Sequence, residues 1–413
     1  MVHSINLSQI VHLKFDRSKA SFDLESNGLS IHLDALDRQN PKAVISVVDS
    51  NGVVVRHVHN WLHHLIKGAG ISIAESTITQ YANSILYLCR WLEEARPYPS
   101  LQLNEALTVI NRRDIQSWHQ HQGERVQAST LNNREVVAKE FLTWLTTIEG
   151  GEARQMIDSP WGRDNKLPYV AKRSSPKSPK YITPDEIIAL LKMMHNEAER
   201  CMFHTQYDTG LRISELISLT RGDLPPPSLY ADQNVEFVPL YIKGVKGIAG
   251  NQKERISVIS RAVLNRIKNY HSTLAYRQAD QWSVSDPNKP VFLTSNGLPW
   301  SQRNAQKQFK NAVRRSGVED DFVSHWLRHG TAFSVLTSDI GKDYTDRMLT
   351  IQGMLGHAHI KTTEIYTQIS PALLAMLDKE GKRQNRLDEA QRIRSETYLA
   401  PLKHTEKRGK YDR

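Results

Sequence analysis

The chain has 413 residues and a formal net charge of +10, and 39% of its residues are hydrophobic while 24% are charged. These proportions exclude a wholly disordered chain. No apolar run is long enough for a membrane-spanning helix, and two cysteines are too few for a disulfide scaffold or a Cys-rich zinc module. We therefore expect two or three domains in a cytoplasmic protein without a secretion signal, and the basic balance favours a polyanionic partner such as nucleic acid.

Residues 1–65 have strand character and form a predicted N-terminal extension. Two β-branched runs, 43–48 and 53–55, flank the segment Asp49-Ser50-Asn51-Gly52. Asn-Gly between such runs predicts a β-hairpin. The hairpin indicates nothing about function, so the role of the extension is left open, with strands that support the next domain as the simplest expectation.

Residues 66–165 are predicted to form a small helical domain. Apolar residues recur every three or four positions from Ile78 to Leu92, with Thr77 as the expected N-cap, and a later helix covers 131–145. Between these two, Asn111 precedes a helix whose first turn is basic and exposed. The two cations of that turn are candidate DNA contacts: Arg112 and Arg113.

A basic linker is predicted over residues 166–182. Within it, residues 172–180 contain two prolines, three serines and four cations but no acid, a composition that resists packing. The segment is either a solvated tether or a strap along a phosphate backbone, and the sequence favours neither. The second interpretation makes its four cations candidate DNA contacts: Lys172, Arg173, Lys177 and Lys180.

The third and largest domain is predicted over residues 183–380. It begins with Thr183-Pro184-Asp185-Glu186, a capping box that starts a helix. Strand-like runs at 235–242 and 255–259 flank a Gly-rich segment, so a small antiparallel sheet is expected among helices. The predicted fold class is therefore mostly α with a small antiparallel β-sheet: a helical domain and an α+β domain, preceded by the β-containing extension.

Three separate pieces of this domain carry reactive side chains. Each has an ordinary explanation by itself: Arg212 could pair with Glu215, His325 and Arg328 could be a surface pair on one helix face, and His357 could end a helix. Tyr366 could simply belong to the core. The pieces are Thr209-Gly210-Leu211-Arg212-Ile213-Ser214-Glu215-Leu216, Ser324-His325-Trp326-Leu327-Arg328-His329, and Leu355-Gly356-His357 followed by Thr362-Thr363-Glu364-Ile365-Tyr366.

Together with a lysine-bearing loop, these pieces supply the groups that attack a phosphodiester without a metal ion. Arginines bind non-bridging oxygens and stabilise the charge of the transition state. A histidine accepts or relays a proton, and a lysine protonates the leaving oxygen. A tyrosine hydroxyl, whose ordinary pKa is about 10, needs cationic neighbours to act as the nucleophile of a covalent intermediate.

With these motifs in this order and at these spacings, the chain resembles the tyrosine recombinase, or phage-integrase, family over about residues 66–380. The resemblance implies that Arg212 and Arg328 bind the scissile phosphate and that His325 accepts or relays a proton. It also implies that His357 hydrogen-bonds the phosphate and that Tyr366 forms a 3′-phosphotyrosyl link. The remaining matches, Glu215 and His329, would support the site without reacting.

The position of the family's catalytic lysine is left open by the sequence. The family carries it in a β-hairpin loop, where Lys246 fits best and Lys243 and Lys253 are rivals, because this loop is longer than the compact version. A long spacer before His357 also contains Tyr344, a rival nucleophile that lacks the downstream context of Tyr366.

Two metal-dependent alternatives are weak. His59 and His63 are four residues apart, within a cluster that also holds His57 and His64, but no nearby Cys or Glu completes a zinc site. Asp320 and Asp321 are adjacent, so they cannot face one two-magnesium site on a helix. We therefore expect neither a metal nor another cofactor.

The resemblance further implies a site-specific recombinase that integrates or excises a mobile element. Its helical domain would bind the core of a double-stranded attachment site, with four protomers on DNA, a monomer when free, and an accessory DNA-bending or directionality factor; the enzyme would associate with the nucleoid. The rivals are a type IB topoisomerase-like enzyme and a catalytically silent DNA-binding regulator.

Residues 381–413 are predicted to be a basic tail whose role is open, and the part beyond about residue 395 is expected to be disordered. A helix at 370–380 would dock on a neighbouring protomer, as the resemblance implies.

Overall fold

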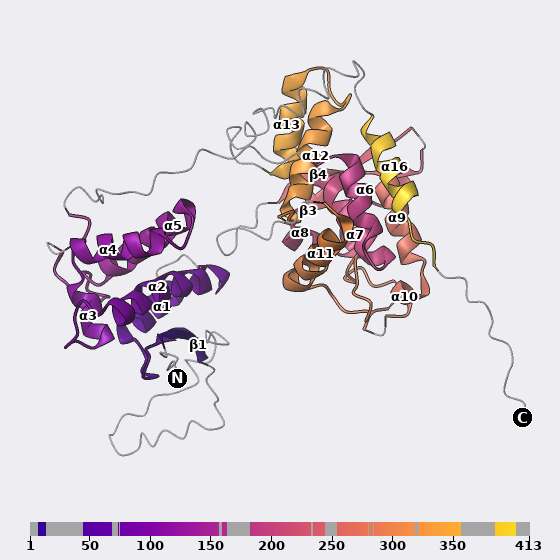
Figure 1. Ribbon diagram of the computed structural model, residues 1–413. Coiled ribbons are helices and arrows are strands. Elements are labelled where there is room, and N and C mark those ends of the chain that lie inside the picture. Colours follow the sequence, from indigo (N-terminus) through magenta and orange to yellow (C-terminus); the bar gives the residue numbers. More distant parts are fainter. Residues whose placement is uncertain are drawn as a thin grey trace, which may run out of the picture. The chain divides into compact units, whose positions relative to one another are not determined.

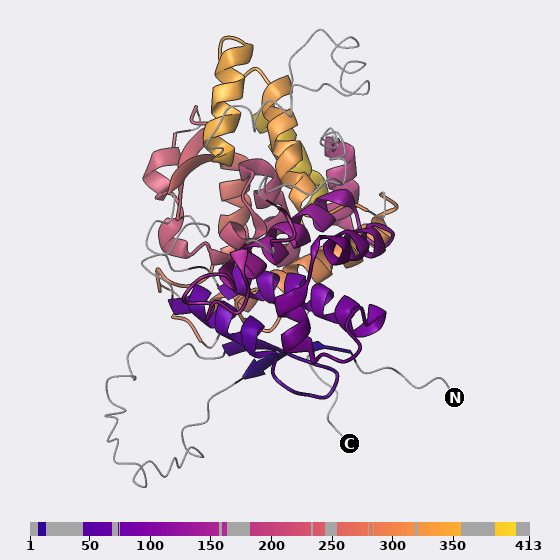
Figure 2. The ribbon, with the colours of Figure 1, turned by 90° about the vertical axis from the view of Figure 1, so that its left-hand side faces the viewer.

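The computed structural model describes residues 7–13, 44–67, 73, 75–156, 159–162, 182–232, 234–243, 254–279, 281–283, 285–318, 321–356 and 385–401. The chain divides into two compact units. Unit 1 comprises residues 1–175 with 248–250, and unit 2 comprises residues 176–247 with 251–413 (Figures 1 and 2). The predicted fold class, mostly α with small antiparallel sheets, is confirmed.

The strands of unit 1 pair differently from the predicted hairpin. The turn forms as expected: Gly52 has φ +79° and its N–H donates to the Asp49 carbonyl at 3.0 Å. However, β2 (Val44–Val48) pairs antiparallel with β1 (Gln9–Leu13), and the run after the turn contributes only the single bridge Val48–Val54. The chain enters a helix at Arg56, which leaves no length for a second strand.

The helices of unit 1 share one hydrophobic core with its sheet. The indole of Trp61 on α1 stacks on Tyr81 and tilts against Phe141, with ring centroids 5.7 and 5.3 Å apart, and Ile45 and Val47 of β2 are buried in the same cluster. The β-containing stretch therefore packs as part of the helical unit. The helices are α1 (Arg56–Lys67), α2 (Glu75–Ala95), α3 (Leu103–Val109), α4 (Arg112–Gly123) and α5 (Ala128–Trp144).

Two predicted helix starts in unit 1 have different outcomes. Helix α4 begins as predicted: the Asn111 side chain accepts from the N–H of Arg113 at 2.8 Å, and Asp114 accepts from the N–H of Asn111 at 2.8 Å. The N-cap predicted at Thr77 is wrong, because α2 already begins at Glu75 and Thr77 lies in its first turn.

Unit 2 surrounds a central helix, α7, which is buried along nearly its whole length and contacts α9, α12 and β4. The predicted capping box is present at its first helix, where the Thr183 hydroxyl accepts from the N–H of Glu186 at 3.2 Å. The predicted strands pair antiparallel, with Val238 opposite Ile259. The elements are α6 (Pro184–Lys192), α7 (Glu197–Thr209), α8 (Ile213–Ser218), β3 (Phe237–Ile242), β4 (Arg255–Ser260), α9 (Arg261–His271), α10 (Leu274–Arg277), α11 (Gln302–Ser316), α12 (His325–Thr337), α13 (Tyr344–Leu355) and α16 (Arg386–Thr397), with short 3₁₀ turns at Arg221–Asp223 and Pro227–Tyr230.

Helix α16 lies within the stretch that the sequence presented as a basic tail. It packs against α6 and α9, seen at the right of unit 2 in Figure 1, and buries Leu387, Ala390 and Ile393. These residues recur every three positions after Asn385, whose side chain caps the helix. The many charges of the segment obscured this short apolar pattern.

A buried ion pair attaches the end of α16 to the core of unit 2. Arg266 on α9 is 0% exposed, and its guanidinium donates to both Glu197 carboxylate oxygens, at 2.6 and 3.0 Å. The same guanidinium donates to the Thr397 hydroxyl at 2.8 Å and to its carbonyl at 3.0 Å. One arginine thus satisfies acceptors on α7 and α16 together.

Replacement of Arg266 by Met is expected to lower the free energy of unfolding by about 3–5 kcal/mol, because it leaves the Glu197 carboxylate buried without its partner. Urea denaturation at pH 7 measures this loss. Arg392→Met is the matched control, since Arg392 is 52% exposed in its ion pairs with Asp185 and Glu396 and should cost less than about 1 kcal/mol. Equal losses in the two variants would contradict the expectation.

No helix in the described part of the chain combines the length and apolar character needed to cross a membrane.

Candidate active site

The first of the three motif pieces forms the junction between α7 and α8. Gly210 ends α7 with φ +66°, and a Cβ there would lie 2.6 Å from the Leu355 side chain, so both the conformation and the space require glycine. Arg212 then caps α8, and its backbone N–H donates to Glu215 Oε2 at 2.8 Å. Its guanidinium donates to Glu215 Oε1, also at 2.8 Å, while the side chain remains 35% exposed.

The second piece begins α12 and meets the other two through Arg328. This side chain is only 2% exposed, and its guanidinium donates to the Gly210 carbonyl at 2.5 Å and to the Leu355 carbonyl. Gly210 precedes Arg212 in the first piece, and Leu355 begins the third. One arginine therefore brings together three segments that are far apart in the sequence.

The histidines of the second piece lie at the start of α12. His325 is the first residue of the helix and is exposed, whereas His329 is half-buried one turn later. Their rings meet edge to face, with centroids 4.7 Å apart and an interplanar angle of 82°. His325 thus presents an imidazole to solvent at the end of the same helix that positions Arg328.

The third piece is described only to its glycine. Helix α13 ends at Leu355, and Gly356 follows with φ +63°. Several predicted site residues and rivals lie outside the described residues: His357, Tyr366, Lys246, Lys253, Lys172, Arg173, Lys177, Lys180 and Asp320.

Two rival residues from the sequence lie in the described part. Lys243, the alternative to Lys246, is 74% exposed, and its ammonium group lies 2.7 Å from the Asp223 carboxylate. That contact raises the pKa of Lys243 above its ordinary value. Tyr344, the alternative to Tyr366, is 47% exposed as the first residue of α13, one helix length from Gly356.

Sequence reasoning missed Arg255, which contacts the predicted site from the sheet. Its guanidinium donates to Glu215 Oε2 at 2.7 Å and to the Met354 carbonyl near the end of α13. Burial acts to raise the pKa of the Glu215 carboxyl, but the charge and hydrogen bond of Arg255, together with Arg212, hold that pKa below its ordinary value. Both contacts are made across long sequence separations, 40 and 99 residues, so no local signal in the sequence pointed to this role.

Helix α11 carries a second feature that sequence reasoning missed. Ala305, Phe309, Ala312 and Val313 bury one face of this helix, and a row of cations lies elsewhere on it. The cations recur at spacings of four, three and four residues, which places them along one face. They are Arg303, Lys307, Lys310 and Arg314. The spacing was visible in the sequence and could have identified this face as a candidate phosphate contact.

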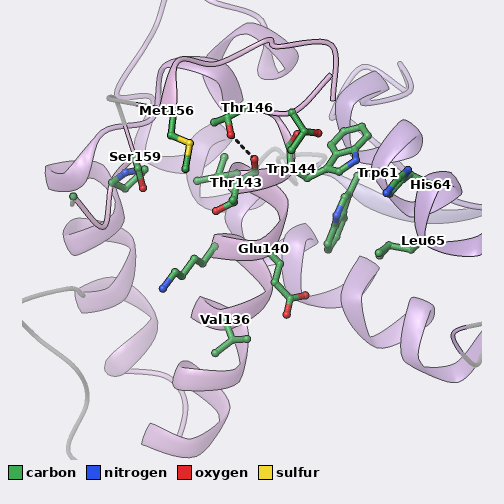
Figure 3. A pocket seen from close by; sticks show the side chains of 15 residues that line it. Trp61, His64, Leu65, Val136, Glu140, Thr143, Trp144, Thr146, Met156 and Ser159 are labelled. Atoms are coloured by element: carbon green, nitrogen blue, oxygen red, sulfur yellow. Dashed lines mark hydrogen bonds between the residues drawn. The ribbon is translucent and has the colours of Figure 1, made fainter. Parts of the chain in front are cut away.

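In unit 1, the exposed cations Arg112 and Arg113 begin α4, as predicted. This unit also contains a cavity of about 1170 Å³ between α1, α5 and the chain after α5 (Figure 3). Trp61, His64 and Val136 line it, and the Thr146 hydroxyl at its rim donates to the Thr143 carbonyl at 2.8 Å. The cavity belongs to unit 1, whereas Arg212, His325 and Arg328 belong to unit 2.

Within the described ranges, no group of three or more His, Cys, Asp or Glu residues is placed to hold a metal ion. The rings of His59 and His63 instead stack on each other, with centroids 6.2 Å apart.

The Arg328 hydrogen bonds therefore join the backbone of all three motif pieces in unit 2. Residues 180–372 match the Phage integrase family. The tyrosine recombinase XerD of Staphylococcus saprophyticus is 24% identical over 72% of this chain and 92% of its own length. Residues 180–372 belong to the phage-integrase family of tyrosine recombinases, and the chain is a site-specific recombinase that cleaves and rejoins DNA.

Solved structures support the fold. The XerH site-specific recombinase bound to palindromic difH substrate aligns with a TM-score of 0.53 at 16% identity, over 74% of this chain and 80% of that chain. A lambda integrase dimer bound to a COC′ core site aligns with a TM-score of 0.54 at 14% identity, over 83% of this chain and 82% of that chain.

Proposed function

We propose that this recombinase cuts DNA through attack of the Tyr366 hydroxyl on the scissile phosphorus. The bond to the 5′-oxygen breaks, and a 3′-phosphotyrosine forms that conserves the energy of the phosphodiester. His325 takes the proton of the tyrosine, and Lys246 gives a proton to the leaving 5′-oxygen. A 5′-hydroxyl attacks the phosphotyrosine in the reverse step, so the proposed cycle requires neither ATP nor a metal ion.

The single observation that carries this proposal is the pair of hydrogen bonds from Arg328 to Gly210 and Leu355. They bring Gly210, two residues before Arg212, and Leu355, two residues before His357, to the start of α12. We propose that Arg328 both supports this junction and binds the scissile phosphate together with Arg212 and His357. Glu215 orients Arg212 through the 2.8 Å hydrogen bond, and His329 supports His325 through ring contact.

The proposed partner is a double-stranded DNA attachment site. The basic face of α11 and the exposed start of α4, with Arg112 and Arg113, supply phosphate contacts. The linker cations Lys172, Arg173, Lys177 and Lys180 would add to them. Because each neutralised phosphate releases counterions, affinity should fall steeply with salt.

On DNA, the proposed assembly has four protomers on two duplexes and an accessory DNA-bending or directionality factor. Without DNA, the protein is proposed to be a monomer. The related structures described above hold DNA sites, in one case with a dimer. Integration or excision of a mobile element is the proposed biological role and rests on family membership alone. A topoisomerase-like activity on one duplex remains the alternative within the same chemistry.

A pool of nicked suicide duplexes, randomised on both sides of the nick, tests the proposal. Loss of the short fragment at the nick traps the covalent complex, which resists denaturing detergent. The purified wild-type chain is expected to recover a defined sequence in such complexes without added metal or ATP. No covalent complex at any sequence would overturn the proposed chemistry. With two intact copies of the recovered site, exchanged strands support recombination, whereas relaxation without exchange supports the topoisomerase alternative.

A further inference from the structure

Arg255, the first residue of β4, joins two parts of the active site that Arg328 does not join directly. One end of its guanidinium donates to Glu215 Oε2 at 2.7 Å, in the first residues of α8. The other end donates to the Met354 carbonyl, in the last turn of α13. The side chain is 9% exposed, so these contacts are made away from bulk water.

The aliphatic part of the Arg255 side chain also restricts the residue that follows α13, Gly356. A Cβ on Gly356 would clash with Arg255 Cδ, in a residue whose φ of +63° already favours glycine. The chain therefore leaves α13 directly over the Arg255 side chain. The next residue in the sequence is His357, which is proposed to bind the scissile phosphate.

The Glu215 carboxylate connects Arg255 to Arg212. Oε2 accepts from both the Arg255 guanidinium and the Arg212 backbone N–H, at 2.7 and 2.8 Å, whereas Oε1 accepts from the Arg212 guanidinium at 2.8 Å. Two cations thus share one buried carboxylate. Without Arg255, Oε2 would lose its charged donor and the carboxylate could turn about its side-chain torsions, which would release the Arg212 guanidinium.

We propose that Arg255 is a positioning residue for DNA cleavage: it orients Arg212 through Glu215 and holds the end of α13 from which His357 follows. The inference rests on the proposed roles of Arg212 and His357. Arg255 acts on these groups and not on DNA, so its loss should slow cleavage without weakening DNA binding.

The geometry requires arginine at this position. Its two acceptors lie on different elements, and the planar guanidinium presents donors toward both at once. A lysine keeps the positive charge but concentrates its donors at one point. Arg255→Lys should therefore retain the contact with Glu215 or the contact with Met354, but not both, and should be intermediate between the wild type and Arg255→Met.

The matched control is Arg200, which also fastens segments of unit 2 through backbone carbonyls. Its guanidinium donates to Lys192 at 2.8 Å, to Met194 at 3.1 Å and to Thr397 at 3.0 Å. These carbonyls belong to the end of α6, the turn after it and the end of α16, and none belongs to the three motif pieces. Arg200→Met thus removes a comparable structural contact away from the proposed site.

The experiment uses the full chain and the suicide duplex recovered with the wild type. It measures the DNA dissociation constant, the single-turnover rate of covalent complex formation and the melting temperature. Arg255→Met is expected to form the complex at least about tenfold more slowly, since a charged hydrogen bond commonly contributes at least that factor, with an unchanged dissociation constant. Arg200→Met should melt earlier but cleave at the wild-type rate.

Chemical rescue separates positioning from folding. Arg255→Ala leaves a space that added guanidinium ion can enter, so millimolar guanidinium should accelerate its cleavage but not that of Arg200→Ala or the wild type. The proposal is overturned if Arg255→Met cleaves at the wild-type rate while folded, or if its loss of rate matches that of Arg200→Met and guanidinium restores nothing. A wild-type chain that forms no covalent complex would instead contradict the proposed function.

Discussion

Tyr366→Phe is expected to bind DNA with wild-type affinity and to form no covalent complex at all. The substitution removes only the hydroxyl oxygen that is proposed to attack phosphorus, and no neighbouring group can replace a bond-forming atom. Titration of the suicide duplex under native conditions measures the affinity, and detergent-resistant complexes on the same duplex measure covalent complex formation.

Tyr344→Phe is the control for this experiment, because Tyr344 is the alternative nucleophile from the sequence. It is exposed at the start of α13 and is expected to be dispensable for cleavage. If Tyr366→Phe forms the covalent complex and Tyr344→Phe does not, the nucleophile has been assigned to the wrong tyrosine.

Arg328→Lys is expected to reduce the rate of covalent complex formation by at least about a hundredfold, the usual cost of removing one preorganised donor to a transition state. Lysine cannot donate to the carbonyls of Gly210 and Leu355 in the way that the guanidinium does, so the three motif pieces also lose their common partner. We expect a loss of about 1–3 kcal/mol in the free energy of unfolding as well.

Single-turnover kinetics and urea denaturation of the same preparation separate the two effects of Arg328→Lys. Arg200→Lys, which alters an arginine bound to carbonyls away from the site, should show a loss of stability without the loss of rate. If Arg328→Lys cleaves at the wild-type rate in its folded state, Arg328 only stabilises the fold and does not bind the scissile phosphate.

Local signals predicted several elements because their causes are local. The Thr183 capping box and the Asn111 cap depend on atoms three residues apart, and both are present. The strands β3 and β4 follow from short apolar runs on either side of a Gly-rich segment. The turn at Gly52 follows from one residue that adopts positive φ readily. Strand partners are chosen by the rest of the fold, and for this reason β2 pairs with β1.

The positive charge illustrates the same division between local and tertiary causes. The last 35 residues hold eleven Lys and Arg against six acids, and the sequence predicted a basic tail whose role was left open. Within them, Arg386 is 3% exposed and donates to the Asp208 carbonyl, directly before the first motif piece. Only packing against α7 reveals that this cation supports the fold.

The sequence by itself determined which reactions are open to this protein, because the required side chains and their order are written in three motifs around Arg212, Arg328 and Tyr366. The tertiary structure decided how the described members of those motifs are held. Arg328 forms hydrogen bonds with Gly210 and Leu355, which are 118 and 27 residues away in the sequence. Arg255 forms hydrogen bonds with Glu215 and Met354, which are 40 and 99 residues away. Such contacts depend on burial and on the meeting of distant backbone carbonyls, neither of which leaves a local pattern.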